Sequence, residues 1–357
     1  MKKKKNYKEL WNGKEQWSYN YAKSIATYFG PSGKENLTTS IEIGNEPSIK
    51  FDTALYKTIF KNMAQGIRDG DSKIKIITPC VTVDNPDEYA QDLKGIYAQT
   101  DILPLYDVIN LHSYASVQAN EGPFNRSYPE DPTIEYLNNI DKTISWRDEH
   151  APDKEIWITE FGYDASTAEA MKNRKDWALK LDWQGTTDEQ QAQYLVRSYL
   201  AFAERGIQRA YLFYYNDEDE ASIHASSGIT RHFQPKKSFW ALKQLYQTLG
   251  DYRLKRVVKK QEGNIYIYEF ENGSNPDQLV WVAWSPTGTK THKKDNYKPR
   301  IVETTINGLP SSPIDVIGMA TSENSVPKPT WKSTSPLTIT LDISESPIYI
   351  YFDKSKM

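Results

Sequence analysis

The chain contains a single cysteine, Cys80, in 357 residues. An internal disulfide is therefore excluded, and the redox compartment is left undecided. The five histidines show no metal-ligand spacing, and no glycine-rich phosphate loop is present. No apolar run approaches the roughly 18 residues of a membrane-spanning helix, and no signal peptide follows the lysines at 2–5. We therefore expect no metal, no cofactor and no membrane span.

The charges are nearly balanced, with 47 acidic and 44 basic residues and a net charge of -3. This balance excludes the basic footprint that nucleic-acid binding requires. Aromatic residues are plentiful, at 13% of the chain with 10 tryptophans and 24 tyrosines. Flat rings of this kind stack on sugar faces, but they also fill ordinary cores and interfaces.

The first two thirds of the chain alternate short apolar runs with amphipathic helices, which is typical of a parallel α/β sheet. The runs predict strands over 40–44, 73–78, 106–114, 155–160 and 208–215. The helical periodicity predicts helices over 15–28, 53–66, 88–97, 133–149, 190–205 and 237–249. This alternation indicates a (β/α) barrel domain over 1–255.

The pattern changes after about Val257 to short strands separated by Gly, Asn, Ser and Pro. The strands are predicted over 264–270, 279–284, 300–306, 313–318, 337–343 and 347–352. Such spacing is typical of an antiparallel β-sandwich. We therefore expect an accessory β-sandwich domain over 256–357.

The strand count falls short of a complete barrel. A (β/α)8 barrel needs eight strand–helix units, whereas the sequence offers five, and three more units of roughly 30 residues cannot fit before Ser40. We expect a partial barrel that lacks its first three strands and has an unpaired edge at each end. Proteins ordinarily avoid such edges, so we expect self-association or a missing N-terminal segment that completes the barrel.

Two of the predicted parallel strands end in a glutamate. The first is followed by Ile43-Gly44-Asn45-Glu46-Pro47, and the fourth reads Trp157-Ile158-Thr159-Glu160-Phe161-Gly162. The proline after Glu46 predicts an extended backbone there, and the carboxyl ends of barrel strands carry catalytic groups. Glycoside hydrolysis uses two carboxyl groups, one protonated for the leaving oxygen and one ionised. A strand-end glutamate alone is more often a salt-bridge partner, but the pair favours catalysis.

These two motifs resemble the active-site signatures of clan A glycoside hydrolases, with family 39 and family 5 as the most similar types. The resemblance implies a retaining mechanism, with Glu46 as the acid/base after strand four and Glu160 as the nucleophile after strand seven. The 114 positions between them leave room for three strand–helix units. Residues 107–114, which end in His-Ser-Tyr, resemble the sixth strand, and residues 212–216 resemble the eighth. The chain departs from the clan by lacking strands one to three and an arginine near the nucleophile.

Further roles follow from the same resemblance. Asn45 would bind the sugar 2-hydroxyl, an interaction that strengthens in the transition state. His112 and Tyr114 would line the pocket beside the nucleophile, with the Tyr114 hydroxyl as a partner of Glu160. The alternative for His112 is a satisfied core histidine.

Three aromatic residues complete the predicted substrate site. Tyr214 would form a stacking platform below the sugar, where clan members commonly have tryptophan; its alternative is an ordinary core aromatic. Trp177 and Trp183 lie in the long connection 164–187. They would serve either as outer subsites or as packing within that loop.

The predicted function is therefore retaining hydrolysis of O-glycosidic bonds in a poly-, oligo- or glycoconjugate saccharide, with carboxyl groups about 5–5.5 Å apart. Two alternatives remain: a non-catalytic carbohydrate-binding or scaffolding protein, and an inactive fragment of a longer hydrolase. The family resemblance suggests a secreted or periplasmic location. The sugar, the linkage and exo or endo action are left open.

Overall fold

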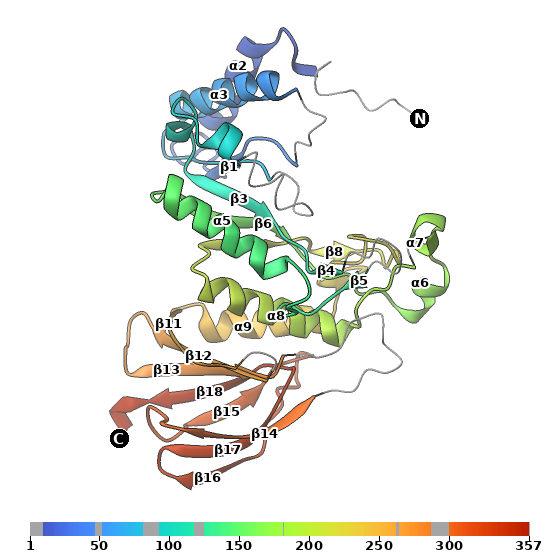
Figure 1. Cartoon of the computed structure of the whole chain (residues 1–357), viewed down its shortest axis with the longest axis vertical. Coiled ribbons are helices and arrows are strands. Elements are labelled where there is room, and N and C mark those ends of the chain that lie inside the picture. Colours follow the sequence, from blue (N-terminus) through green and yellow to red (C-terminus); the bar gives the residue numbers. More distant parts are fainter. Residues whose placement is uncertain are drawn as a thin grey trace. The chain divides into compact units, whose positions relative to one another are not determined.

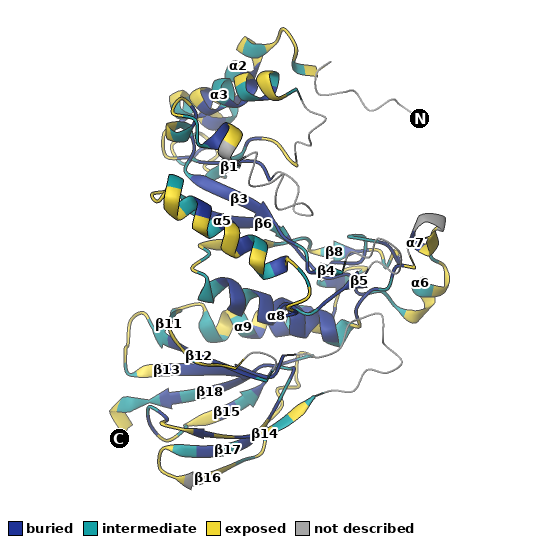
Figure 2. Cartoon of the chain, in the orientation of Figure 1, coloured by how far each residue is buried: buried dark blue, intermediate teal, exposed yellow. Residues whose placement is uncertain are grey.

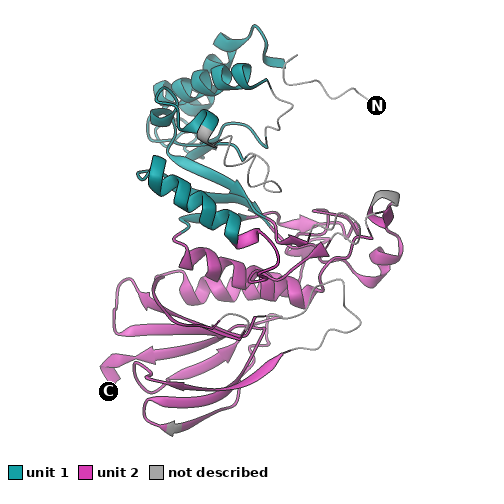
Figure 3. Ribbon diagram, viewed as in Figure 1, with its two compact units in different colours: residues 1–113, 138–161, 207–211 teal, residues 114–137, 162–206, 212–357 magenta. Residues whose placement is uncertain are grey.

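A computed structural model describes residues 10–46, 52–80, 93–117, 125–180, 182–261, 264–286 and 300–356 (Figure 1). The chain divides into two compact units (Figure 3). Unit 1 comprises residues 1–113, 138–161 and 207–211, and unit 2 comprises residues 114–137, 162–206 and 212–357.

Unit 1 is built on a five-stranded sheet in the order β1-β2-β3-β6-β7. The strands are β1 (Ser40–Glu42), β2 (Lys75–Ile77), β3 (Val108–His112), β6 (Glu155–Phe161) and β7 (Arg209–Leu212). The pairs β1–β2, β2–β3 and β3–β6 are parallel. The helices between them are α3 (Thr53–Gly70), the short turns η1 (Leu93–Tyr97) and η2 (Leu103–Leu105), and α5 (Tyr136–His150), while α2 (Glu15–Phe29) precedes β1. The predicted partial barrel of five strands is confirmed; residues 88–92 of one predicted helix lie outside the described residues.

Local sequence explains the main elements of this unit. Asp52 caps α3, because its side chain accepts a hydrogen bond from the backbone N–H of Leu55 at 3.1 Å. The Val-Ile-Asn-Leu-His run of β3 is buried throughout, as expected of a parallel strand covered on both faces. The three residues of β1, by contrast, are only half-buried. The sheet is therefore best covered in its middle and least covered at β1.

The described C-terminal part of unit 2, from residue 252 on, forms two antiparallel sheets in the orders β11-β12-β13-β18-β15 and β14-β17-β16. The strands are β11 (Tyr252–Gln261), β12 (Ile265–Asn272), β13 (Gln278–Trp284), β14 (Ile301–Asn307), β15 (Asp315–Gly318), β16 (Trp331–Ser335), β17 (Thr338–Ser344) and β18 (Ile348–Asp353). Trp281, Ile350 and Ile339 pack between the sheets. The other face of the first sheet packs on α8 (Asp188–Glu204) and α9 (Lys237–Leu249), with Tyr268 against Val196 and Leu200. Most residues of β12, β13 and β18 are buried (Figure 2). The predicted β-sandwich is confirmed.

Two sandwich strands were not predicted. The strand β11 carries mostly exposed Lys and Arg side chains and two bulges, as is usual for an edge strand, so its apolar alternation is weak. The strand β16 is also at a sheet edge. The domain boundary between 255 and 256 falls within β11 and stays a prediction.

Unit 2 also contains several short elements that connect the larger ones. They are β4 (Ser116–Val117), β5 (Asn125–Arg126), α6 (Ala168–Lys172), α7 (Asp176–Lys180), β8 (Asn216–Asp217), β9 (Thr230–Arg231), β10 (Gln234–Pro235) and η4 (Lys354–Lys356). Among the helices of the described ranges, none has the length and apolar character needed to cross a membrane.

Candidate active site

Glu46 lies four residues beyond the end of β1, after a turn at Gly44. Gly44 has φ +99°, a conformation that glycine adopts without steric cost. Glu46 itself has φ +31°, so the predicted extended backbone at this residue is wrong. The chain has already left the strand at Glu42 and turns at Gly44, which brings the Glu46 side chain back toward β3. Pro47 lies outside the described residues.

Glu160 lies in β6, beside the end of β3. The register of the two strands shifts here, so that Leu111 pairs with Ile158 but His112 pairs with Glu160. The backbone N–H of Ser113 then donates to the Glu160 carbonyl at 2.9 Å. Irregularities of this kind change the direction in which side chains point. This one aligns His112 with Glu160 and leaves Thr159 as the extra residue.

His112 lies between the two glutamates. Its Nδ1 is 2.7 Å from Oε1 of Glu46 and 3.6 Å from Oε2 of Glu160. Its Nε2 is 3.0 Å from the hydroxyl of Thr159. The His112 side chain is 1% exposed, whereas Glu46 is 47% and Glu160 25% exposed. His112 is therefore a buried and hydrogen-bonded histidine that also contacts both predicted catalytic residues.

The ligand atoms of Glu46, His112 and Glu160 all lie within 4.8 Å of one another, close enough to hold a cation. We interpret the group as two carboxyl groups joined by an imidazole. Both ring nitrogens of His112 already have hydrogen-bond partners, Glu46 and Thr159, within the protein. A metal-bound imidazole would have to give up one of them.

Sequence reasoning missed three polar residues behind this group: Glu42, Asn110 and Thr159. The Thr159 hydroxyl donates to Oδ1 of Asn110 at 2.8 Å, and Oε1 of Glu42 is 3.9 Å from Nε2 of His112. Burial raises the pKa of the Glu42 carboxyl above its usual value, against the opposing effect of His112. Polar side chains within otherwise apolar parallel strands were the signal that could have identified them.

Cys80 is buried at the end of the β2 segment, where its sulfur accepts a hydrogen bond from the His112 backbone N–H at 3.0 Å. Burial raises the pKa of its thiol well above the usual value. A thiol that stays protonated is a poor nucleophile, and the sequence predicts no catalytic role for Cys80.

Two of the predicted substrate-binding residues, Tyr114 and Tyr214, belong to unit 2. The ring of Tyr114 lies 4.3 Å from that of His224, edge to face, and the Arg126 guanidinium lies 4.8 Å from its centre. The Tyr214 hydroxyl donates to the Ala225 carbonyl at 2.8 Å, and burial raises the pKa of Tyr214 to about 12. The partnership of Tyr114 with Glu160 and the platform role of Tyr214 stay predictions.

The long connection 164–187 contains two tryptophans, Trp177 and Trp183. Trp183 is fully buried and packs with Ala178 and Ala221. The structure therefore favours loop packing over an outer subsite for Trp183. Trp177 is part of α7, but its side chain lies outside the described residues.

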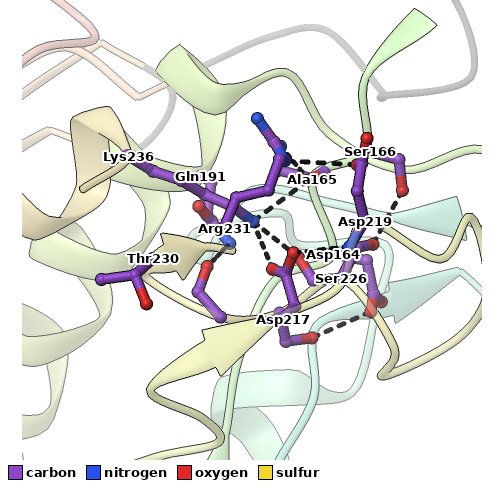
Figure 4. Close-up of polar contacts among 12 residues, drawn as sticks. Asp164, Ala165, Ser166, Gln191, Asp217, Asp219, Ser226, Thr230, Arg231 and Lys236 are labelled. Carbon is purple, nitrogen blue, oxygen red and sulfur yellow. Dashed lines mark hydrogen bonds and ion pairs between the residues drawn. The ribbon is translucent and has the colours of Figure 1, made fainter. Parts of the chain in front are cut away.

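A buried polar cluster in unit 2 holds together the segments that follow β6 and β7 in sequence (Figure 4). The Lys236 ammonium donates to Asp217 at 2.5 Å, to the Ser226 carbonyl at 3.1 Å and to the Ala165 carbonyl at 3.2 Å. Burial lowers the pKa of Lys236, against the opposing effect of Asp217. Arg231 donates to the Ala165 carbonyl as well, at 2.7 Å. The cluster uses every N–H of the Lys236 ammonium and ties the segment around Ala165 to the small sheet β10-β9-β8, in which Asp217 and Arg231 lie.

Comparisons with known proteins identify the fold. No protein-family model and no curated protein sequence matches this chain. Solved structures do match it. The chain shares its fold with glycoside hydrolases. A family 39 glycoside hydrolase from the gut symbiont Bacteroides cellulosilyticus WH2 matches with a TM-score of 0.63 and 16% identity, over 96% of this chain and 62% of that one.

Two further solved structures match at similar levels. A family 30 endoxylanase from Clostridium papyrosolvens C71 has a TM-score of 0.56 and 14% identity, over 96% of this chain and 72% of that one. A glucosidase from Croceicoccus marinus has a TM-score of 0.62 and 11% identity, over 95% and 74%. The chain thus spans about 62% of the length of the family 39 hydrolase. At these identities the likeness extends to the fold alone.

Proposed function

We propose that this chain carries the catalytic pair of a retaining glycoside hydrolase, with Glu46 as the general acid/base and Glu160 as the nucleophile. The observation that supports it is the group of Glu46, His112 and Glu160, whose side-chain ligand atoms lie within 4.8 Å of one another. Retaining enzymes hold their carboxyl groups about 5–5.5 Å apart, and inverting enzymes about 6.5–9.5 Å apart. The close spacing supports the retaining class.

In the proposed reaction a Glu160 carboxylate oxygen attacks the anomeric carbon of the sugar. The bond from that carbon to the leaving oxygen breaks, and Glu46 gives its proton to the leaving oxygen. Glu46, now a carboxylate, then takes a proton from water while the water oxygen attacks the anomeric carbon. This step releases Glu160 and restores the proton of Glu46.

The substrate is an O-glycosidic bond of a poly-, oligo- or glycoconjugate saccharide. Asn45 follows the turn at Gly44 and would bind the sugar 2-hydroxyl, and Tyr114 and Tyr214 would supply further contacts. A secreted or periplasmic location accords with the resemblance to polysaccharide-degrading enzymes.

The stereochemical outcome tests this function directly. The protein is incubated with 4-nitrophenyl glycosides of common hexoses and pentoses in both anomeric forms, and the first product is followed by proton NMR. We expect the anomer of the substrate to appear before mutarotation. A first product of the opposite anomer would rule out the nucleophile role of Glu160.

A second candidate is carbohydrate binding without turnover, alone or as an inactive part of a longer hydrolase. The end of the unit 1 sheet favours it, because β1 is the terminal strand there and a cavity of about 300 Å³ opens beside it. Ile41, Ile43 and Tyr21 line this mostly apolar cavity. Affinity electrophoresis in gels with soluble polysaccharide distinguishes the two functions: retardation with no release of reducing sugar would favour binding alone.

A further inference from the structure

Glu42 is a third carboxyl group beside the proposed catalytic pair. It is the last residue of β1, and its Oε1 is buried with no hydrogen-bond partner among the described residues. The Thr159 hydroxyl and the Cys80 backbone N–H interact with the carboxyl group. Nε2 of His112 lies 3.9 Å from Oε1 of Glu42, too far for a hydrogen bond but close enough for a strong charge effect.

The hydrogen bonds of Thr159 determine which nitrogen of His112 carries a hydrogen. Oδ1 of Asn110 accepts from both the backbone N–H of Thr159, at 3.2 Å, and its hydroxyl, at 2.8 Å. The hydroxyl has one hydrogen, and whether that hydrogen goes to Asn110 or to the Glu42 carboxyl, the oxygen must accept from Nε2 of His112 at 3.0 Å. His112 therefore carries a hydrogen on Nε2.

A single proton then lies in the 2.7 Å contact between Nδ1 of His112 and Oε1 of Glu46. It resides either on Glu46, which leaves a neutral imidazole, or on Nδ1, which gives an imidazolium beside a carboxylate. General acid catalysis by Glu46 needs the first arrangement. Nearby negative charge favours the second, because it stabilises the imidazolium.

Within the described ranges, the ionisable groups that face this imidazole come from three segments. Glu160 lies 3.6 Å from Nδ1, on the side of Glu46, and Glu42 lies on the opposite side, near Nε2. Burial keeps the Cys80 thiol protonated, and its sulfur accepts a hydrogen bond from the backbone N–H of His112. Since Glu160 must be ionised to act as the nucleophile, Glu42 is, among these described groups, the one whose charge can decide where the proton resides.

We propose that Glu42 is a positioning residue that remains uncharged and thereby keeps the shared proton on Glu46 rather than on His112. This role rests on the proposed function. Ionisation of Glu42 transfers the proton from Oε1 of Glu46 to Nδ1 of His112, and Glu46 then loses its acid form. Burial, which raises the pKa of Glu42, extends the pH range over which Glu46 keeps its proton.

Nitrogen-15 NMR of the full chain labelled on histidine tests the proposal without any need for turnover. The chain has five histidines, and His112→Asn assigns the signal. In the wild type we expect His112 to be neutral with hydrogen on Nε2, and its Nδ1 to gain a proton as the pH rises through the ionisation of Glu42. This direction is opposite to that of an ordinary histidine.

In Glu42→Gln, which preserves shape but cannot ionise, we expect complete loss of that inverse transition. Glu155→Gln is the matched control, because Glu155 lies at the far end of β6, where its carboxylate accepts a hydrogen bond from the Trp157 indole N–H at 2.7 Å. The titration of His112 in this variant should equal that in the wild type. Identical titrations of His112 in the wild type and Glu42→Gln would overturn the proposal, as would a wild type without the inverse transition.

A second pair of variants tests the path through Thr159. Thr159→Val removes the hydroxyl and should produce a mixture of His112 tautomers, while Thr159→Ser should restore the hydrogen on Nε2. Circular dichroism establishes that each variant is folded. A single unchanged tautomer in folded Thr159→Val would overturn the assigned role of this hydroxyl.

The kinetic readout is the alkaline limb of kcat/KM on substrates with poor leaving groups, which should move to higher pH in Glu42→Gln. If no glycoside is hydrolysed, the proposed function fails while the NMR comparison still decides the role of Glu42.

Discussion

Each of the two units contains a glutamate on a β-strand, and the surroundings shift the pKa values of the two carboxyl groups in opposite directions. Glu269 in the sandwich is bound by Arg256 at 3.0 Å and by the Trp281 indole N–H at 2.7 Å. Burial acts to raise its pKa, but these hydrogen bonds hold the pKa below the usual value. Glu42 in the parallel sheet has a buried oxygen without such a donor among the described residues, and its pKa is raised.

The same contrast extends to the sheets that carry them. The sandwich strands β12 and β13 run over eight and seven residues and pack on both faces. The strands β1 and β2 have three residues each, and the interiors of β3 and β6 contain Asn110, His112 and Thr159. Departures from simple apolar packing are expected at functional sites. The comparison therefore predicts that the sandwich contributes most of the stability, and it accords with the chemistry proposed for the parallel sheet.

The largest expected effect is on turnover. Glu160→Ala should abolish hydrolysis by several orders of magnitude, because the covalent intermediate cannot form. Glu46→Ala should reduce kcat by about 10²–10⁴-fold on substrates with poor leaving groups, and far less on activated aryl glycosides that need no proton. Steady-state kinetics on both substrate types measures this, with Glu155→Gln as control. Equal losses on both types for Glu46→Ala would contradict the acid/base role.

The buried ion pair of unit 2 provides the next largest effect. Lys236→Met leaves the Asp217 charge buried without its partner, which should lower the free energy of unfolding by about 3–5 kcal/mol. The double variant Lys236→Met/Asp217→Leu should recover much of this loss, since no unpaired charge remains. Urea denaturation followed by circular dichroism measures both; a double variant no more stable than the single one would show that the pair acts through geometry.

Apolar truncations should distinguish the sandwich core from the end of the parallel sheet. Ile350→Ala removes a fully buried side chain and should cost about 2–5 kcal/mol. Met63 lines the cavity of about 300 Å³ beside β1, so Met63→Ala should cost less than about 2 kcal/mol, because part of its surroundings is already empty. Urea denaturation compares the two, and similar losses would contradict the difference in packing.

The terminal strand β1 should promote association between copies of the chain. Size-exclusion chromatography with light scattering should show a mass that rises with protein concentration. Ile41→Lys, which places a charge on the edge strand, should shift the chain toward the monomer. A stable wild-type monomer with cooperative unfolding would show that the end of this sheet is adequately covered as it stands.

The smallest effects are on the pH dependence of stability, and they should have opposite signs in the two units. The lowered pKa of Glu269 means that its contribution is present above the unfolded-state pKa and is lost as pH falls through the folded-state pKa. The raised pKa of Glu42 means that the folded state loses stability as pH rises from the unfolded-state pKa to the folded-state pKa. At neutral pH, Glu269→Gln should therefore destabilise the protein and Glu42→Gln should not. Thermal unfolding between pH 4 and pH 8 checks the signs.

Much of the fold could be predicted because it depends on short-range patterns. The helix α9 was predicted with its observed bounds, 237–249, since its apolar residues recur at helical spacing. The strand β11 was missed because its exposed Lys and Arg side chains obscure the apolar alternation on which strand prediction depends. Glu46 and Glu160 could be chosen because each lies near the end of a recognisable strand, in a distinctive local sequence, although their catalytic roles remain proposals.

Glu42 and Thr159 could not have been selected in this way. Their proposed roles come from the pairing of separate strands: the sheet places Oε1 of Glu42 3.9 Å from Nε2 of His112, and the register shift between β3 and β6 leaves Thr159 as the extra residue beside it. The extended backbone predicted at Glu46 was wrong, because the chain turns at Gly44 and places the Glu46 carboxyl 2.7 Å from Nδ1 of His112.

The sequence by itself thus determined the order of strands and helices, the change from parallel to antiparallel sheets, and the two candidate carboxyl groups. These depend on periodicity and on residues adjacent along the chain. The tertiary structure alone decided that His112 joins Glu46 to Glu160, and that Glu42 has a buried oxygen close to that imidazole. Those contacts join residues from separate strands, and their hydrogen bonds and burial depend on three-dimensional distances that no local pattern encodes.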